Sequence, residues 1–192
     1  MKGFLWIGFV LVITTWGSSQ KISAQDPTPP PPPAIFKAPI PSELTSFTSA
    51  DGTFEAVFPG KPNVDKAAGT DVVAESTYFS RNGARTSVTV LIFPTDLEPM
   101  KEGFLRNYKA KFLSDGKTTI EAERDDENGG RPYKEFNIKN GYIYEIRRIF
   151  IVKSRLFEIK TSATNWHIIG EETKRSFFKE AERFLASFKI LK

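Results

Sequence analysis

The stretch YKEFNIKNGYIYEIRRIFIV, residues 133–152, decides the fold. Two runs of alternating apolar and polar residues flank Asn140-Gly141. An Asn-Gly pair between such runs is the strongest short-range signal for a β-hairpin. At 149–152 the alternation gives way to Ile-Phe-Ile-Val. A continuous apolar run is typical of a strand buried on both faces, so we expect this strand in the middle of a sheet.

The hairpin pattern occurs again nearer the N-terminus, where Asn82-Gly83 separates alternating runs at 72–80 and 86–93. This predicts a second pair of antiparallel strands. Further runs have the composition and length of single strands at 53–58, 118–123 and 155–162. The chain therefore carries about six to seven strands.

Two segments have the periodicity of amphipathic helices. In 98–114, apolar residues recur every four positions at Met100, Phe104, Tyr108 and Phe112. In 171–188, the apolar residues at helical spacing are Phe177, Phe178, Ala181, Phe184, Leu185 and Phe188. Antiparallel hairpins interrupted by two helices predict an α+β fold, in which an antiparallel sheet of about six to seven strands carries two main amphipathic helices. The length of 192 residues suits one such domain, at 45–192.

The first 24 residues have the layout of a secretory signal peptide. Lys2 supplies the positive charge, 3–16 form the apolar segment, and Ile22-Ser23-Ala24 ends it with small residues. We expect cleavage between Ala24 and Gln25. The alternative is an uncleaved anchor, but 14 apolar residues fall short of the roughly 20 that a bilayer requires. The expected product is secreted or periplasmic, with no membrane insertion after cleavage.

Residues 25–44 form a proline-rich spacer, with an unbroken proline run at 29–33. Such a run favours an extended polyproline II rod because each ring fixes φ and removes a backbone donor. We expect a disordered but stiff tether. The alternative is a ligand for a proline-binding groove.

Composition excludes several classes of function. The chain has no cysteine, which rules out disulfides, thiolate nucleophiles and sulfur-ligated zinc. Removal of 1–24 would leave 25 basic and 23 acidic residues, a net charge of +2, which gives no drive toward nucleic acid. We expect no cofactor, and a monomer whose partner is an envelope protein or a small ligand.

Both ends of the expected domain carry a family resemblance. The opening FTSADGTFEAVFPGKP, residues 47–62, resembles the start of many exported bacterial proteins of the PsbP-like group, and the closing AERFLASFKI, residues 181–190, is similar to the helix that ends them. Arg131-Pro132-Tyr133 and the hairpin at 144–156 fall where that group has its central strands. The resemblance covers roughly 45–192 and implies an α/β/α sandwich shared by PsbP, a Ran-binding protein and several bacterial lipoproteins. Those relatives bind partners and share no reaction.

An acidic segment concentrates oxygen ligands at Asp125, Asp126, Glu127 and Asn128, followed by two glycines. Calcium takes such ligands, but the segment lacks the alternate spacing and distal glutamate of an EF-hand. We therefore expect a solvated turn between strands, with a weak metal site as the alternative.

Two further pairs are candidate binding residues. Glu145 and Arg147 lie two positions apart on one strand, so their side chains share a face of the sheet. We expect them to form a mutually neutralising ion pair, with a polar pocket as the alternative. Trp166 and His167 lie just before the last helix. Trp166 either covers the hydrophobic core or contacts a binding partner. His167 is a lone histidine, which by itself forms neither a metal site nor a Ser-His-Asp triad.

Two functions of different class follow. The first is an exported, non-enzymatic accessory or binding module, PsbP-like in fold. The alternative is a carboxylate-dependent hydrolase or isomerase of the cell envelope, in which the acidic segment and the Glu145/Arg147 pair take part. We expect no catalytic residues and favour the first function, because no catalytic cluster is recognisable in the sequence.

Overall fold

Ten strands form two antiparallel sheets in residues 43–68 and 72–191, the part of the chain that this computed structural model describes. The expected signal peptide at 1–24, its junction between Ala24 and Gln25, and all of the spacer except residues 43–44 lie outside the described residues. Among the described residues no helix has the length and apolar character needed to cross a membrane.

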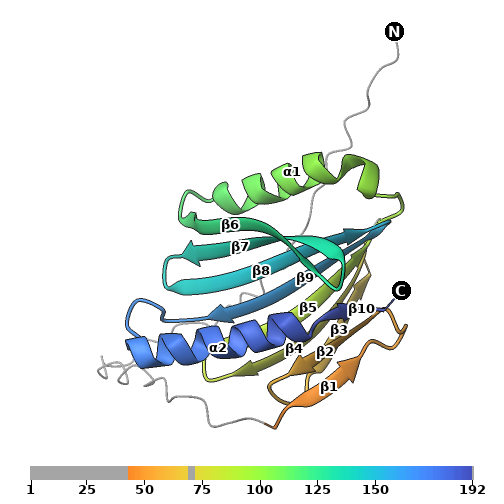
Figure 1. Ribbon diagram of the computed structural model, residues 1–192. Helices are drawn as coiled ribbons and strands as arrows, with labels where there is room; N and C mark the ends of the chain where they lie inside the picture. The colour runs from red at the N-terminus through yellow and green to blue at the C-terminus, as the bar shows by residue number, and fades with distance from the viewer. Residues whose placement is uncertain (1–42, 69–71, 192) are drawn as a thin grey trace, which may run out of the picture. The chain divides into compact units, whose positions relative to one another are not determined.

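The larger sheet has seven strands in the order β3-β4-β5-β9-β8-β7-β6 (Figure 1). Their bounds are β3 Asn63–Ala68, β4 Val73–Arg81, β5 Ala84–Ile92, β6 Thr118–Asn128, β7 Arg131–Asn140, β8 Ile143–Val152 and β9 Arg155–Ala163. Strand β8 lies between β9 and β7, and Ile149, Phe150 and Ile151 are buried. The interior position predicted from the apolar run is thus confirmed.

The smaller sheet joins the two ends of the described chain. It contains β1 (Thr45–Thr48), β2 (Phe54–Phe58) and β10 (Lys189–Ile190), with β2 in the centre. The strand predicted at 53–58 is therefore present, but it belongs to this second sheet. Strands β1, β3 and β10 were not predicted, because β1 and β10 span only four and two residues and β3, with the sequence NVDKAA, lacks a regular alternation of apolar and polar residues.

The helices cover opposite faces of the seven-stranded sheet. A 3₁₀ turn, Glu98–Met100, leads into α1, Lys101–Leu113, and α2 spans Glu171–Ser187. Leu105 of α1 packs with Phe136 and Ile149, whereas Phe184 of α2 packs with Phe150 and Phe157. Because successive side chains of a strand point to opposite faces, these two clusters lie on either side of the sheet. The α+β class is confirmed.

Three sequence expectations need correction. The acidic segment is no turn: it forms the end of β6, and only Gly129 and Gly130, both at positive φ, turn the chain. The second hairpin turn is formed by Gly141 and Tyr142 and not by Asn140-Gly141, because Asn140 pairs with Ile143 as the last residue of β7. The side-chain amide of Asn140 donates to Asp115 and Thr118. Met100 is 54% exposed and does not pack with the buried face of α1.

Candidate functional site

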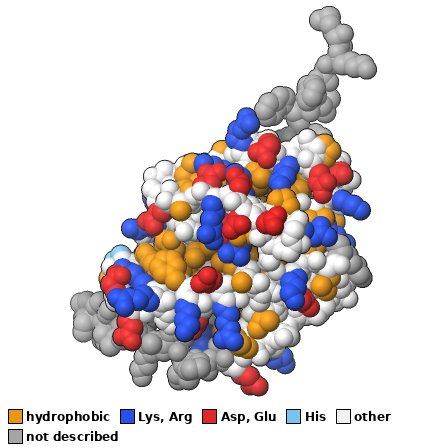
Figure 2. Space-filling model, viewed as in Figure 1, with side chains coloured by type: hydrophobic (Ala, Val, Ile, Leu, Met, Phe, Trp, Pro, Cys, Tyr) orange, Lys and Arg blue, Asp and Glu red, His pale blue; other side chains and the backbone are white. Residues whose placement is uncertain are grey.

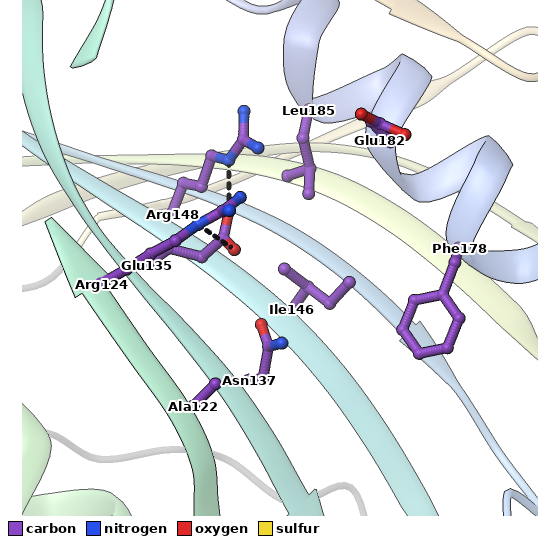
Figure 3. A pocket seen from close by; sticks show the side chains of 9 residues that line it. All are labelled: Ala122, Arg124, Glu135, Asn137, Ile146, Arg148, Phe178, Glu182 and Leu185. Atoms are coloured by element: carbon purple, nitrogen blue, oxygen red, sulfur yellow. Dashed lines mark hydrogen bonds and ion pairs between the residues drawn. The ribbon is translucent and has the colours of Figure 1, made fainter. Parts of the chain in front are cut away.

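A pocket of about 310 Å³ lies between α2 and strands β6, β7 and β8. Figure 3 shows that strand side chains enter it from one side and α2 side chains from the other. Its lining combines charged, amide and apolar groups: Ala122, Arg124, Glu135, Asn137, Ile146, Arg148, Phe178, Glu182 and Leu185.

One wall is a charged triad in which Glu135 lies between two arginines (Figure 3). The Nε atom of Arg124 lies 2.9 Å from Oε1 of Glu135, and the Nε atom of Arg148 lies 2.6 Å from Oε2. Glu135 and Arg148 are only 5% and 7% exposed. The guanidinium of Arg148 also lies 4.7 Å from the centre of the Tyr133 ring, a cation–π contact. Each guanidinium reaches Glu135 through Nε, and an arginine carries two further Nη groups that can donate hydrogen bonds.

Asn137 contributes an acceptor without a partner. Its Oδ1 atom is buried and makes no hydrogen bond within the described residues. The side chain points up between the strands and α2 (Figure 3), and it hydrogen-bonds the Tyr144 hydroxyl. Burial raises the pKa of Tyr144, and the bond from Asn137 opposes that rise. A buried carbonyl oxygen without a donor costs about 1–3 kcal/mol.

Aromatic side chains continue from the pocket to the surface. Phe178, 40% exposed, lines the pocket and lies 5.5 Å from the Trp166 ring. Trp166 is buried and stacks on Tyr144 at 4.4 Å. Figure 2 shows hydrophobic side chains gathered between α2 and the strands, with the single histidine, His167, at the edge of the molecule. Trp166 is thus part of the core beside the pocket, while His167 is exposed.

The acidic segment does not converge on one point. Asp126 faces α2 and accepts a bond from the Tyr133 hydroxyl at 3.1 Å, whereas Asp125 faces the other side and pairs with Lys134. The backbone N–H of Glu127 and then the Tyr133 hydroxyl lower the pKa of Asp126. Asn128 donates to the carbonyl of Phe188 at 2.8 Å. No group of three or more potential ligands suited to a metal is present among residues 43–68 and 72–191.

Glu145 and Arg147 lie on the α1 face, away from the pocket. Arg147 Nε donates to Glu145 at 2.8 Å, which forms the predicted pair, and Arg147 Nη1 lies 3.4 Å from Glu158. Glu158 also accepts a bond from the Tyr108 hydroxyl of α1. Burial raises the pKa of Glu158, and Lys160 opposes that rise. The donors of this network, Tyr108 and Arg147, thus bond to its own carboxylates, Glu145 and Glu158.

The carboxylates proposed for catalysis stay apart. Asp125 pairs across β6 and β7 with Lys134, and Glu145 pairs across β8 and β7 with Ile138. Lys134 and Ile138 lie four positions apart on β7, which corresponds to about 13 Å along the strand.

Sequence reasoning missed the residues that line the pocket. A usable signal was present in β8, where Arg148 interrupts the apolar face made by Tyr144, Ile146 and Phe150. A charge on a buried face requires a partner, and Glu135 on the neighbouring strand supplies it. The contributions of α2, namely Phe178, Glu182 and Leu185, depend on how the helix packs and leave no comparable pattern.

Comparisons with known proteins give little. No family model matches the chain, and no curated protein matches it. Among solved structures, the chain is similar to a protein from Bacteroides thetaiotaomicron VPI-5482 whose crystal structure was determined at 1.50 Å resolution. The two share 12% identity with a TM-score of 0.35, over 80% of this chain and 50% of that one. The chain thus spans about half the length of that protein.

Proposed function

We propose that this protein is an exported, non-enzymatic binding module that takes a small ligand in the pocket under α2. One observation carries the proposal: a pocket of about 310 Å³ under α2 is lined by Arg124, Arg148 and Asn137 together with apolar side chains. Pockets that combine apolar surface with a few converging polar groups are the usual binding sites of small ligands.

Export and a PsbP-like fold belong to the same proposal. The layout of 1–24 supports export, and the spacer at 25–44 would hold the domain away from a surface. The two segments that resemble the PsbP-like group meet in the smaller sheet, where Lys189 pairs with Glu55 and Ile190 with Phe54.

The ligand is tested on the full chain with a small-molecule extract of the producing cells. We expect the extract to raise the midpoint of thermal unfolding of the wild type, and native mass spectrometry to show a bound mass. Asn137→Leu removes the acceptor and fills part of the cavity, so both signals should disappear. In the absence of extract this variant should unfold within about 1 kcal/mol of wild type, because loss of the Tyr144 bond offsets relief of the orphaned oxygen.

Thr77→Val is the matched control. Thr77 Oγ1 is also buried without a partner, but it lies on β4, outside the pocket. This variant should respond to the extract as the wild type does. An equal response from wild type and Asn137→Leu would refute the pocket as the binding site.

Export has a separate test. The intact mass of the protein recovered outside the cytoplasm should correspond to a chain that begins at Gln25. A protein that keeps residues 1–24 and stays in the cytoplasm contradicts this part of the proposal.

A further inference from the structure

We infer that the ligand of this pocket is an uncharged, polyhydroxylated molecule the size of one sugar ring. The inference rests on the proposed function, because it names the chemical class that the same pocket accepts. It follows from the charge, the hydrogen-bonding groups and the apolar surface of the lining.

The charges of the lining cancel. Arg124 and Arg148 contribute two positive charges, and Glu135 and Glu182 contribute two negative ones. Asp126 faces the same side of the sheet but is not among the residues that line the pocket. A charged ligand of either sign would give up its hydration for surroundings without a net opposite charge, and that exchange is unfavourable. A neutral ligand avoids this cost.

The polar groups of the lining require a ligand that both donates and accepts. The Nη groups of the two arginines can donate, whereas the Glu182 carboxylate accepts. A hydroxyl group does both at once, since it has one O–H donor and two lone pairs. Neighbouring hydroxyls on one ring would therefore serve the arginines and Glu182 together.

The remaining lining suits the C–H face of a ring. Ile146 and Leu185 are buried on the two sides of the pocket (Figure 3). The half-exposed Phe178 ring lines the part of the pocket nearest to Trp166. A volume of about 310 Å³ lies at the lower end of ligand pockets. It accommodates a single ring and excludes a buried oligosaccharide chain.

The test is calorimetric titration of the full chain with neutral hexoses and N-acetylhexosamines, each paired with the uronate and the amino sugar of the same ring. At least one neutral sugar should bind, about tenfold or more tighter than both charged analogues. Its affinity should not change between low and high salt, because no net charge is neutralised on binding. Tighter binding of a uronate, an amino sugar or a free amino acid than of every neutral sugar would overturn the inference.

A charge change in the lining sharpens the test. Glu182→Gln on the exposed side of α2 gives the lining one excess positive charge. The uronate should then gain about tenfold in affinity relative to the neutral sugar. Glu172→Gln, also exposed on α2 but outside the pocket, should change neither. Equal effects of the two variants on the uronate would contradict the assignment.

Failure of this inference is distinct from failure of the proposed function. If the cell extract stabilises wild type but not Asn137→Leu, and no neutral sugar binds, the pocket is a ligand site and only the chemical class is wrong. If Asn137→Leu responds to the extract as wild type does, the site itself is refuted and the inference falls with it.

Discussion

The two faces of the seven-stranded sheet are built differently. On the α2 face, aromatic rings from both sheets and the helix form one continuous cluster, which includes Phe54, Phe58, Phe184 and Phe188. On the α1 face, the helix buries only Leu105 fully, and charged side chains form a network around Arg147 and Glu158. The largest aromatic cluster and the polar groups that line the pocket therefore lie on the same side of the sheet.

The reason lies in how each helix meets its strands. The network under α1 is closed, since Tyr108 and Arg147 both donate to Glu158. Under α2, the charged triad and Asn137 border a space that no side chain fills. The hydrogen bonds under α1 hold that helix against the sheet. Under α2, by contrast, polar side chains line a space that a ligand can occupy.

The largest expected effect is on the α2 face. Phe184 is 2% exposed and its ring lies 5.1 Å from that of Phe58, which joins the helix to the smaller sheet. Phe184→Ala should lower the free energy of unfolding by about 3–5 kcal/mol in chemical denaturation. A loss below about 1 kcal/mol would mean that this cluster does not hold the domain together.

The matching change on the α1 face should cost less. Leu105 is the one fully buried residue of α1, and Leu105→Ala should lower the free energy of unfolding by about 2 kcal/mol, at the low end for buried leucines. The same denaturation experiment measures it. A larger loss than for Phe184→Ala would reverse the comparison between the faces.

The charged network adds a dependence on pH. Because burial raises the pKa of Glu158 in the folded protein, stability is fully present below the ordinary glutamate pKa of about 4.3 and falls as pH rises through the folded value. Glu158→Gln removes this loss. The stability of wild type relative to Glu158→Gln should therefore decline as pH rises above about 4. A difference that stays constant with pH contradicts the assignment.

The smallest effect is expected at Met100, which precedes α1. Its side chain is 54% exposed, so Met100→Ala should change the free energy of unfolding by less than about 0.5 kcal/mol. A loss comparable to that of Leu105→Ala would show that Met100 packs with the α1 face after all.

The sequence alone predicts the elements whose signals are local. The Asn-Gly pairs located both hairpins, and the spacing of Phe177, Ala181 and Phe184 located α2. It did not predict that Asp125 to Asn128 continue a strand, because their low β-propensity is offset by cross-strand partners such as Lys134. The pocket needs three strands and a helix at once, so no local pattern describes it.

The most direct test of the central claim follows both faces together by nuclear magnetic resonance. A neutral sugar identified by calorimetry is added to the labelled protein, and amide signals are recorded. The side-chain amide of Asn137 and the backbone amides of Ile146 and Leu185 should shift, while those of Leu105 and Tyr108 stay unchanged. Shifts confined to the α1 face would contradict the placement of the ligand under α2. An Asn137 side-chain signal that does not shift at saturating sugar would also contradict it.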